Sequence, residues 1–259
     1  MEAMRHASTF LLSSSVERAG DLSPPDYALV VLNRPLLRFA PLLWERAKLR
    51  VCADGGANSL FDGMPELFPE EDPEEVRLKY KPDVIIGDLD SISTKVKDFY
   101  SDLGVKIVRV TEQEFPDLHK CVAFICDCTP SLEKSNLHIL VAGALGGRFD
   151  HEMGNINVLY HFSNMRIILL SDHCLIYLLP KTHRHEIYIQ SSVEGPRCGL
   201  IPFGAPASSI TTTGLQWDLT EGSMHFGGLE STSNSVREEK ITVHSDSDLL
   251  WTISIRKPR

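Results

Sequence analysis

The sequence predicts two domains of different fold class, an α/β domain with a mainly parallel, doubly wound sheet and an all-β sandwich. In residues 27–170, short apolar runs alternate with stretches of helical periodicity, which is typical of a parallel sheet covered by helices. In residues 171–259, short alternating runs are separated by turn residues, with no helical period between them. Residues 1–26, rich in serine and closed by Pro24 and Pro25, are expected to form a flexible arm.

Six buried strands are expected in the α/β domain, because six runs are short, apolar and rich in β-branched residues. They are residues 27–32, 49–53, 84–86, 105–110, 137–142 and 166–170. Helical spacing between them predicts helices over residues 38–48, from about residue 60, over 93–103, through 120–125 and over 151–162. The acidic, proline-containing residues 65–79 are expected to be a surface connection.

The second domain is expected to consist of short strands only. Alternating runs bounded by glycine and proline predict strands at residues 174–179, 185–190, 199–202, 208–213, 224–226, 240–244 and 250–255.

Composition limits the class of function. A net charge of −9 argues against a general partner of nucleic acid or of an anionic membrane surface, and no apolar run is long enough for a membrane span. The six cysteines form no regular framework, so reduced thiols and a cytosolic, cytoplasmic location are expected. A zinc site at Cys121, Cys126 and Cys128 and an organellar transit peptide in the N-terminal arm are the less favoured alternatives.

Two carboxylates, Asp88 and Asp90, follow the apolar run 84–86 directly. Ligands of open α/β sheets bind at the carboxyl ends of the strands. Carboxylates held this close repel each other unless a cation lies between them, and Mg²⁺ prefers oxygen ligands. The alternative is structural, with Asp88 capping a turn and Asp90 capping the next helix.

Three further turns belong to the same edge if the strands are parallel. Residues 54–58, Asp-Gly-Gly-Ala-Asn, have the glycines and the helix start of a phosphate-binding turn, although any tight turn can use such glycines. Asp117 stands at the next strand-to-helix junction, where it can cap the helix or join Asp88 and Asp90. Residues 143–150, GALGGRFD, follow the fifth strand. The recurrence of acidic and glycine-rich turns predicts one polar site at this edge.

Taken together, the turns resemble the thiamin pyrophosphokinase family. The resemblance covers the chain from about residue 27 to its end, and it rests on seven stretches in the family's order: 54–58 (DGGAN), 87–91 (GDLDS), Asp117 with Lys120, 146–150 (GGRFD), 198–202 (CGLIP), 211–217 (TTTGLQW) and 231–234 (STSN). It implies ATP-dependent transfer of pyrophosphate to thiamine with Mg²⁺, giving AMP and thiamine diphosphate. It also implies a homodimer with active sites at the dimer interface, each drawing on both domains.

The resemblance implies a role for each matching residue. Asp88, Asp90 and Asp117 would hold Mg²⁺, with Asp54 and Arg148 completing the catalytic set. Residues that would bind the nucleotide are Gly55, Gly56, Asn58, Gln113, Lys120, Gly146, Gly147 and Asp150. Trp217, Ser231 and Asn234 would bind thiamine, since a cationic thiazolium ring suits an aromatic face. The alternatives are a core position for Trp217 and turn positions for Ser231 and Asn234.

One position departs from the family pattern. Pro116 stands directly before Asp117, where the family usually has threonine, and proline offers neither a hydroxyl nor a backbone N–H. The sequence therefore predicts an active enzyme with weakened ATP binding at this turn. Two other functions compete with this prediction. One is an aspartyl-nucleophile phosphatase of the HAD type, because Asp88-x-Asp90 follows a strand. The other is a catalytically idle sensor of thiamine or nucleotide.

Overall fold

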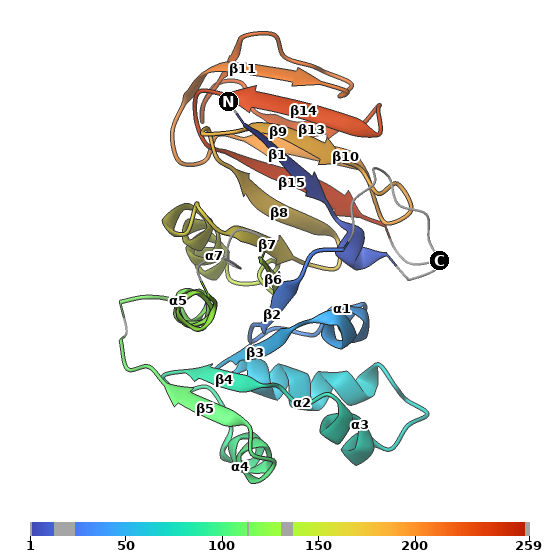
Figure 1. Ribbon diagram of the computed structural model, residues 1–259, viewed down its shortest axis with the longest axis vertical. Coiled ribbons are helices and arrows are strands. Elements are labelled where there is room, and N and C mark those ends of the chain that lie inside the picture. Colours follow the sequence, from blue (N-terminus) through green and yellow to red (C-terminus); the bar gives the residue numbers. More distant parts are fainter. Residues whose placement is uncertain (1, 13–23, 113, 131–136, 257–259) are drawn as a thin grey trace. The chain divides into compact units, whose positions relative to one another are not determined.

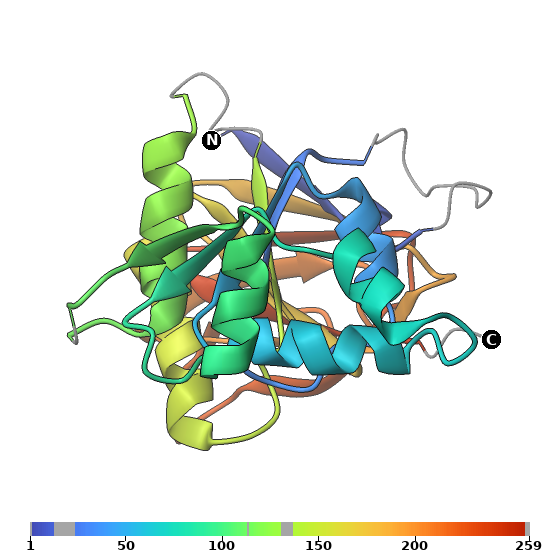
Figure 2. The same ribbon diagram turned by 90° about the horizontal axis from the view of Figure 1, so that it is seen from below.

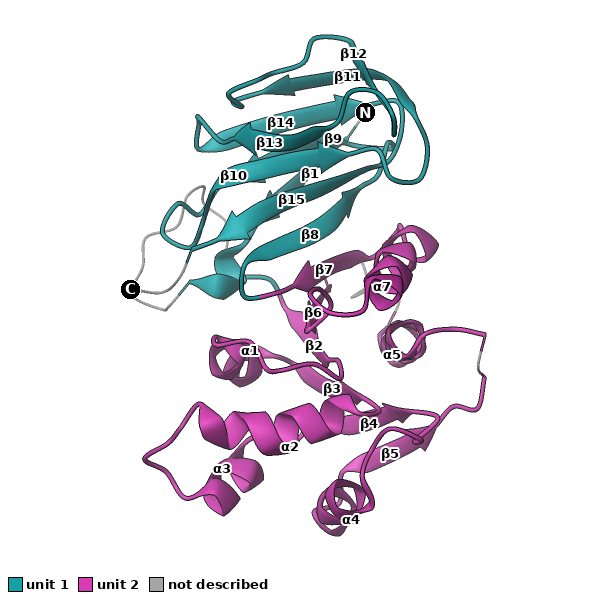
Figure 3. Ribbon diagram, turned by 180° about the vertical axis from the view of Figure 1, so that it is seen from behind, with its two compact units in different colours: residues 1–25, 172–259 teal, residues 26–171 magenta. Residues whose placement is uncertain are grey.

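The computed structural model describes residues 2–12, 24–112, 114–130 and 137–256. The chain divides into two compact units, which we call the α/β unit (residues 26–171) and the β unit (residues 1–25 with 172–259) (Figure 3). Among the helices that the structure describes, none is long and apolar enough to cross a membrane.

The α/β unit is built on a sheet in which every neighbouring pair of strands is parallel. In spatial order the strands are β7 (Arg166–Leu170), β6 (His138–Ala142), β2 (Tyr27–Val31), β3 (Leu49–Ala53), β4 (Val84–Gly87) and β5 (Lys106–Arg109) (Figure 1). All residues of β2 and β4 are buried, as expected for strands covered on both faces. The predicted parallel sheet is confirmed.

Helices cover both faces of this sheet (Figure 1). On one face, α1 (Ala40–Arg46) and α2 (Gly56–Glu66) pack against the strands, and α4 (Thr94–Asp102) lies beside α2, where Figure 2 shows them in green and cyan. On the other face, α5 (Asp117–Cys128) and α7 (Phe149–His161) pack against the strands and against each other. This arrangement brings the turns that follow β2, β3, β4 and β6 to one edge.

Residues 65–79 are not a plain surface connection, as the sequence prediction had it. Helix α2 continues through Pro65, and α3 (Pro73–Lys79) follows it. The carboxylate of Asp72 accepts hydrogen bonds from the backbone N–H groups of Glu74 (2.8 Å) and Glu75 (3.1 Å). An aspartate N-cap followed by proline at the first helical position strongly indicates the start of a helix. The sequence prediction relied on the acidic composition of the segment and did not use this signal.

The β unit contains two groups of paired strands (Figure 3). Strands β10 (Glu194–Ile201), β15 (Leu249–Ile255), β8 (Cys174–Leu179) and β13 (Ser231–Ser235) form antiparallel pairs. The second sheet has the order β1 (Ala3–Ala7), β9 (Arg184–Tyr188), β14 (Lys240–Ser245), β11 (Ala207–Thr213) and β12 (Gly222–Met224). The predicted all-β domain is therefore observed, with the polar strand β13 added to the strands expected from apolar alternation.

The N-terminal residues are not a loose arm over residues 3–12. Strand β1 pairs in parallel with β9, and the rings of His6 and Tyr177 stack at a centroid distance of 4.9 Å. Phe10, Leu11 and Leu12 are buried. Burial of these apolar side chains stabilises the segment, which the serine-rich composition of residues 1–26 as a whole did not indicate.

Candidate active site

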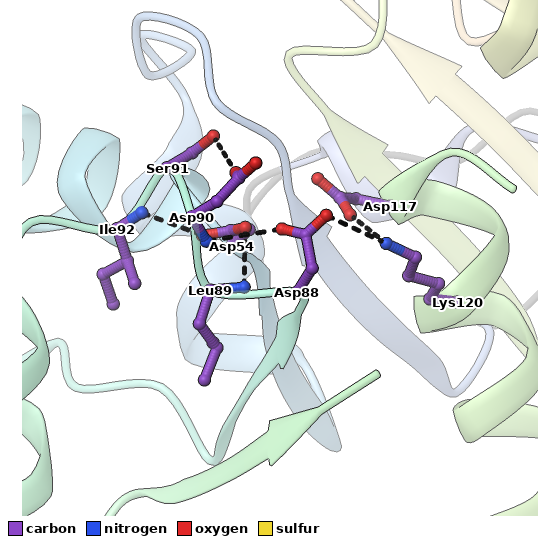
Figure 4. A network of polar contacts seen from close by, with 8 residues as sticks. All are labelled: Asp54, Asp88, Leu89, Asp90, Ser91, Ile92, Asp117 and Lys120. Atoms are coloured by element: carbon purple, nitrogen blue, oxygen red, sulfur yellow. Dashed lines mark hydrogen bonds and ion pairs between the residues drawn. The ribbon is translucent and has the colours of Figure 1, made fainter. Parts of the chain in front are cut away.

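Three carboxylates meet at the edge of the α/β sheet. Asp54 follows β3, Asp88 follows β4, and Asp117 opens α5. Each offers an oxygen that lies within 4.8 Å of an oxygen of the other two (Figure 4). We call this group the acidic cluster. It differs from the predicted metal set in one member, because Asp54 takes the place of Asp90.

Asp54 is the buried member of the acidic cluster, with 1% of its surface exposed. Its backbone has φ = 43°, a left-handed conformation that aspartate tolerates better than most residues. Its carboxylate accepts hydrogen bonds from the backbone N–H groups of Leu89 (3.0 Å) and Ile92 (2.8 Å) (Figure 4). Gly87 leaves room for it, since a Cβ at residue 87 would lie 2.6 Å from the Cβ of Asp54. Asp54 thereby fixes the loop that carries Asp88.

The pKa values of the neighbouring carboxyl groups of Asp54 and Asp88 are shifted in opposite directions. Burial raises the pKa of Asp54 to about 6, and the hydrogen bond with Asp88 and the charge of Asp117 act in the same direction. The same hydrogen bond lowers the pKa of Asp88. Two such carboxylates share one proton when no cation is near, and a divalent cation can take that proton's place. The donor set of the acidic cluster therefore fits Mg²⁺, which takes oxygen ligands.

Lys120 supplies the positive charge within this group. Its Nζ lies 3.0 Å from Oδ1 of Asp117 and 3.7 Å from Oδ2 of Asp88, and its side chain is 4% exposed. Burial by itself lowers the pKa of Lys120, but the hydrogen bond to Asp117 and the charges of the three carboxylates raise it overall. Lys120 therefore stays protonated and holds Asp88 and Asp117 in place.

Asp90 lies in the loop after β4, and Asn58, in the first turn of α2, bonds to that loop. The carboxylate of Asp90 accepts a hydrogen bond from the hydroxyl of Ser91 at 2.8 Å, and Asp90 does not cap α4, whose N-cap is Ser93. The side chain of Asn58 donates to the carbonyl of Ser91 and accepts from the N–H of Ser93. Asn58 was predicted to bind nucleotide, but both of its polar atoms hold the loop.

A cleft of about 700 Å³ adjoins the acidic cluster. It is lined by residues from the turns after β2, β3, β4 and β6 and from the starts of α5 and α7. Of the predicted site residues, the cleft is lined by Gly55, Asp88, Asp90, Asp117, Lys120, Gly146, Gly147, Arg148 and Asp150. Gly56 is buried under the turn, where a Cβ would lie 2.1 Å from the carbonyl oxygen of Val31. Gln113 lies outside the described residues.

The far side of the cleft carries an exposed ion pair. Arg148 donates from Nε to Oδ1 of Asp150 at 3.1 Å and from Nη2 to the other carboxylate oxygen. The hydrogen bond from Arg148 lowers the pKa of Asp150 to about 2. Side-chain exposures of 70% for Arg148 and 62% for Asp150 leave both groups free to exchange this contact for a ligand.

The predicted thiamine-binding residues lie together in the β unit. Trp217, Ser231 and Asn234 line a groove of about 230 Å³. Trp217 is 58% exposed, so the alternative interpretation, a core position for this residue, is wrong. Asn234 is buried and bonds to both the N–H (3.2 Å) and the carbonyl (2.9 Å) of Trp217 and to the hydroxyl of Ser231 (3.1 Å). Asn234 thus positions the tryptophan.

Sequence reasoning missed several residues of the cleft, among them Arg34 and Asn155. Arg34 follows β2 and lines the cleft, and the buried Asn155 of α7 donates from Nδ2 to the carbonyl of Ala144 at 2.9 Å. The signal for Arg34 was its place at a strand end, in the triplet Asn33-Arg34-Pro35, which was interpreted only as a strand terminator. Asn155 lies inside a helix, where nothing in the sequence marks a polar residue as buried.

A parallel sheet with an acidic cluster at its edge, a neutralising lysine and a glycine-rich turn before a helix defines a phosphate-transferring enzyme of the α/β class. Comparison with known proteins makes this specific. The sequence-family model of the thiamin pyrophosphokinase catalytic domain matches residues 40–169. The sequence-family model of the thiamin pyrophosphokinase vitamin B1 binding domain matches residues 184–250. The chain belongs to the thiamin pyrophosphokinase family.

Individual relatives agree with this assignment. Thiamine pyrophosphokinase 1 of Oryza sativa subsp. japonica is 62% identical over 99% of each chain. Thiamine pyrophosphokinase 1 of Arabidopsis thaliana is 60% identical over 99% of this chain and 95% of the relative. The crystal structure of yeast thiamin pyrophosphokinase superposes with a TM-score of 0.79 at 25% identity, covering 98% of this chain and 91% of the yeast chain.

Proposed function

We propose that the cleft of the α/β unit transfers the pyrophosphoryl group of ATP to the hydroxyl group of thiamine. The thiamine oxygen forms a bond to the β-phosphorus, the bond between that phosphorus and the bridging α-phosphate oxygen breaks, and AMP leaves with the bridging oxygen. The hydroxyl proton passes to a carboxylate of the cleft. The observation that carries this proposal is the acidic cluster with Lys120 in a cleft of about 700 Å³, in a chain of the thiamin pyrophosphokinase family.

Asp54, Asp88 and Asp117 are the residues that would hold Mg²⁺. The raised pKa of Asp54 supports this, because burial beside two other carboxylates disfavours the ionised form of Asp54 and a bound cation would favour it. Asp90 remains a candidate ligand because it lines the same cleft. When bound, the ion would neutralise charge that develops on the transferred phosphates.

The remaining residues of the cleft would bind and align the polyphosphate. Lys120 contacts Asp88 and Asp117 and lines the cleft, where it would meet phosphate oxygens as a point charge. Arg148, at the N-cap of α7, would exchange Asp150 for a phosphate and bind it as a fork. The turn at Gly146 and Gly147 has no side chains of its own, so its backbone can approach an anion closely. The N–H of Gly146 donates to Oε1 of Glu152 at 3.0 Å, and a phosphate oxygen would have to replace that carboxylate.

Thiamine would bind at the Trp217 groove of the β unit. The exposed indole offers a face for the cationic thiazolium ring, while Asn234 and Ser231 hold the indole-bearing turn. A homodimer with active sites at the dimer interface, each drawing on both domains, is supported by the family resemblance. Free cysteines and the family resemblance support a cytosolic location. Light scattering on the purified protein tests the dimer.

Analysis of the nucleotide products tests the reaction. With ATP, Mg²⁺ and thiamine, we expect AMP and thiamine diphosphate in equal amounts and no AMP without thiamine. Release of ADP would mean transfer of a single phosphoryl group. A phosphorylated Asp88 would indicate an aspartyl phosphatase, and binding of thiamine without any product would indicate a sensor. Neither alternative is favoured, because high-identity relatives of almost full length are thiamine pyrophosphokinases.

A further inference from the structure

Arg34 lies where the turn after β2 meets the glycine-rich loop after β6. The two strands are neighbours in the sheet, and the backbone N–H of Leu32 still donates to the carbonyl of Ala142 at 3.0 Å. One residue later the chain turns tightly, with the N–H of Arg34 donating to the carbonyl of Leu32 at 2.8 Å. Pro35 follows and cannot continue the ladder. This turn directs Arg34 to the loop of residues 143–148 and into the lining of the cleft.

The glycine-rich loop is shaped around this arginine. A Cβ at Gly147 would lie 2.6 Å from both Cζ and Nη1 of Arg34, and a Cβ at Gly143 would lie 2.9 Å from its Cβ. Both glycines have positive φ, 149° at Gly147 and 77° at Gly143, which disfavours other residues there. Backbone contact on the side of the guanidinium that faces Gly147 restricts how far the group can move.

Charge partners distinguish Arg34 from the other basic side chains that line the cleft. Lys120 is engaged by Asp117 and Asp88, and Arg148 is engaged by Asp150. For Arg34 the structure gives no carboxylate partner among the residues it describes, although the same cleft is lined by Asp88, Asp90, Asp117, Asp150 and Glu152. Arg34 is also exposed, so its N–H groups reach solvent. An arginine held in this way is ready to bind an anion without first breaking an ion pair.

We propose that Arg34 binds the triphosphate of ATP and is a further substrate-binding residue of the reaction. The inference rests on the function proposed above, and it identifies the chemical group that Arg34 recognises. The planar guanidinium presents a fork of N–H donors that matches two phosphate oxygens. Arg34 follows β2, whereas Lys120 belongs to α5 and Arg148 is the N-cap of α7, so basic groups from three different elements line the cleft.

The experiment compares Arg34→Gln with wild type, with Lys97→Gln as the matched control. Lys97 is exposed on α4, does not line the cleft, and its replacement removes the same single charge. Dissociation constants for ATP and for inorganic tripolyphosphate are measured by calorimetry, and steady-state constants are measured in parallel. We expect Arg34→Gln to raise the dissociation constants of both anions about tenfold and to raise the KM for ATP by a similar factor. The KM for thiamine should stay within twofold of the wild-type value. Arg34→Lys should lie between the two.

The outcomes separate this proposal from the proposed reaction. If wild type produces AMP and Arg34→Gln binds tripolyphosphate as wild type does, the proposal for Arg34 is overturned and the reaction stands. If wild type produces no AMP but Arg34→Gln binds tripolyphosphate more weakly, the reaction fails and the anion-binding role stands. If Arg34→Gln lowers Tm and leaves both anion affinities unchanged, Arg34 only braces the loop, which also overturns the proposal.

Discussion

Asp54 and Glu194 are two buried acids in different units, and burial raises the pKa of both. Asp54 reaches a pKa of about 6 and Glu194 a pKa of about 7. Asp54 has two carboxylates as neighbours, Asp88 and Asp117, and both of these line a cleft. Glu194 accepts a hydrogen bond from the N–H of Gln190 at 2.7 Å and has a further hydrogen-bond partner in Ser8. A raised pKa marks a functional site only when like charges and an accessible cleft accompany burial.

The largest effect is expected from Asp88→Asn, which removes one charge from the acidic cluster while keeping the shape of the side chain. We expect kcat to fall by about 10²–10³-fold, because electrostatic stabilisation of the transferred phosphates is the main task of the site. AMP and thiamine diphosphate should decline together in product analysis. A variant that retains more than a tenth of the wild-type rate would remove the acidic cluster from the mechanism.

A second effect is expected from Lys120→Met, which replaces the charge with an apolar chain of similar length. Asp88 and Asp117 then face the cleft without a neutralising partner, so the KM for ATP should rise about tenfold. Lys97→Met, on the exposed face of α4, serves as the control and should leave the KM for ATP unchanged. Equal values in the two variants would show that Lys120 acts only in folding.

Glu194→Gln sharpens the comparison through stability. The pKa of Glu194 in the folded protein is about 7, above its ordinary value of 4.5. The folded state therefore favours the protonated acid, and this contribution is full below pH 4.5 and is lost as the pH rises through about 7. The amount is about 3 kcal/mol at most. Relative to Glu194→Gln, wild type should thus lose unfolding free energy between pH 5 and pH 8, as measured with urea. A constant difference between the two proteins would contradict this assignment.

The smallest effect is expected from Pro116→Thr. Pro116 is the N-cap of α5 and makes no side-chain capping hydrogen bond. A threonine hydroxyl can cap the helix, which is worth about 1 kcal/mol of unfolding free energy, and can also donate to a phosphate. We expect the KM for ATP to fall about twofold to threefold and Tm to rise slightly. An unchanged KM would show that the proline costs the enzyme nothing at this turn.

The sheet and its functional edge could be predicted because buried parallel strands leave a strong signal. The runs at 27–32 and 84–86 are apolar throughout, and the polar turns that follow such runs have to meet at one edge. Asp88, Asp117 and Lys120 were predicted at this edge, and the structure brings them together. Their roles in catalysis remain proposals.

The parts that could not be predicted depend on tertiary contacts. Strand β13 has the polar sequence STSNS, which lacks the apolar alternation that marks a strand. It is a strand because it pairs with β10. Asp54 rather than Asp90 completes the acidic cluster because Leu89 and Ile92 bind the Asp54 carboxylate from a loop that begins more than thirty residues later. Arg34 gains its place from the space above Gly143 and Gly147, which spacing along the chain does not reveal.

The role of the acidic cluster is tested most directly by the turnover number of Asp54→Asn, measured beside that of Glu194→Gln at pH 7.5 with saturating ATP, Mg²⁺ and thiamine. Both variants neutralise one buried acid with a raised pKa and keep its shape. We expect a loss of at least about a hundredfold for Asp54→Asn and a rate within twofold of wild type for Glu194→Gln. Similar rates in the two variants would contradict the central claim that the acidic cluster, and not burial of an acid as such, carries the reaction.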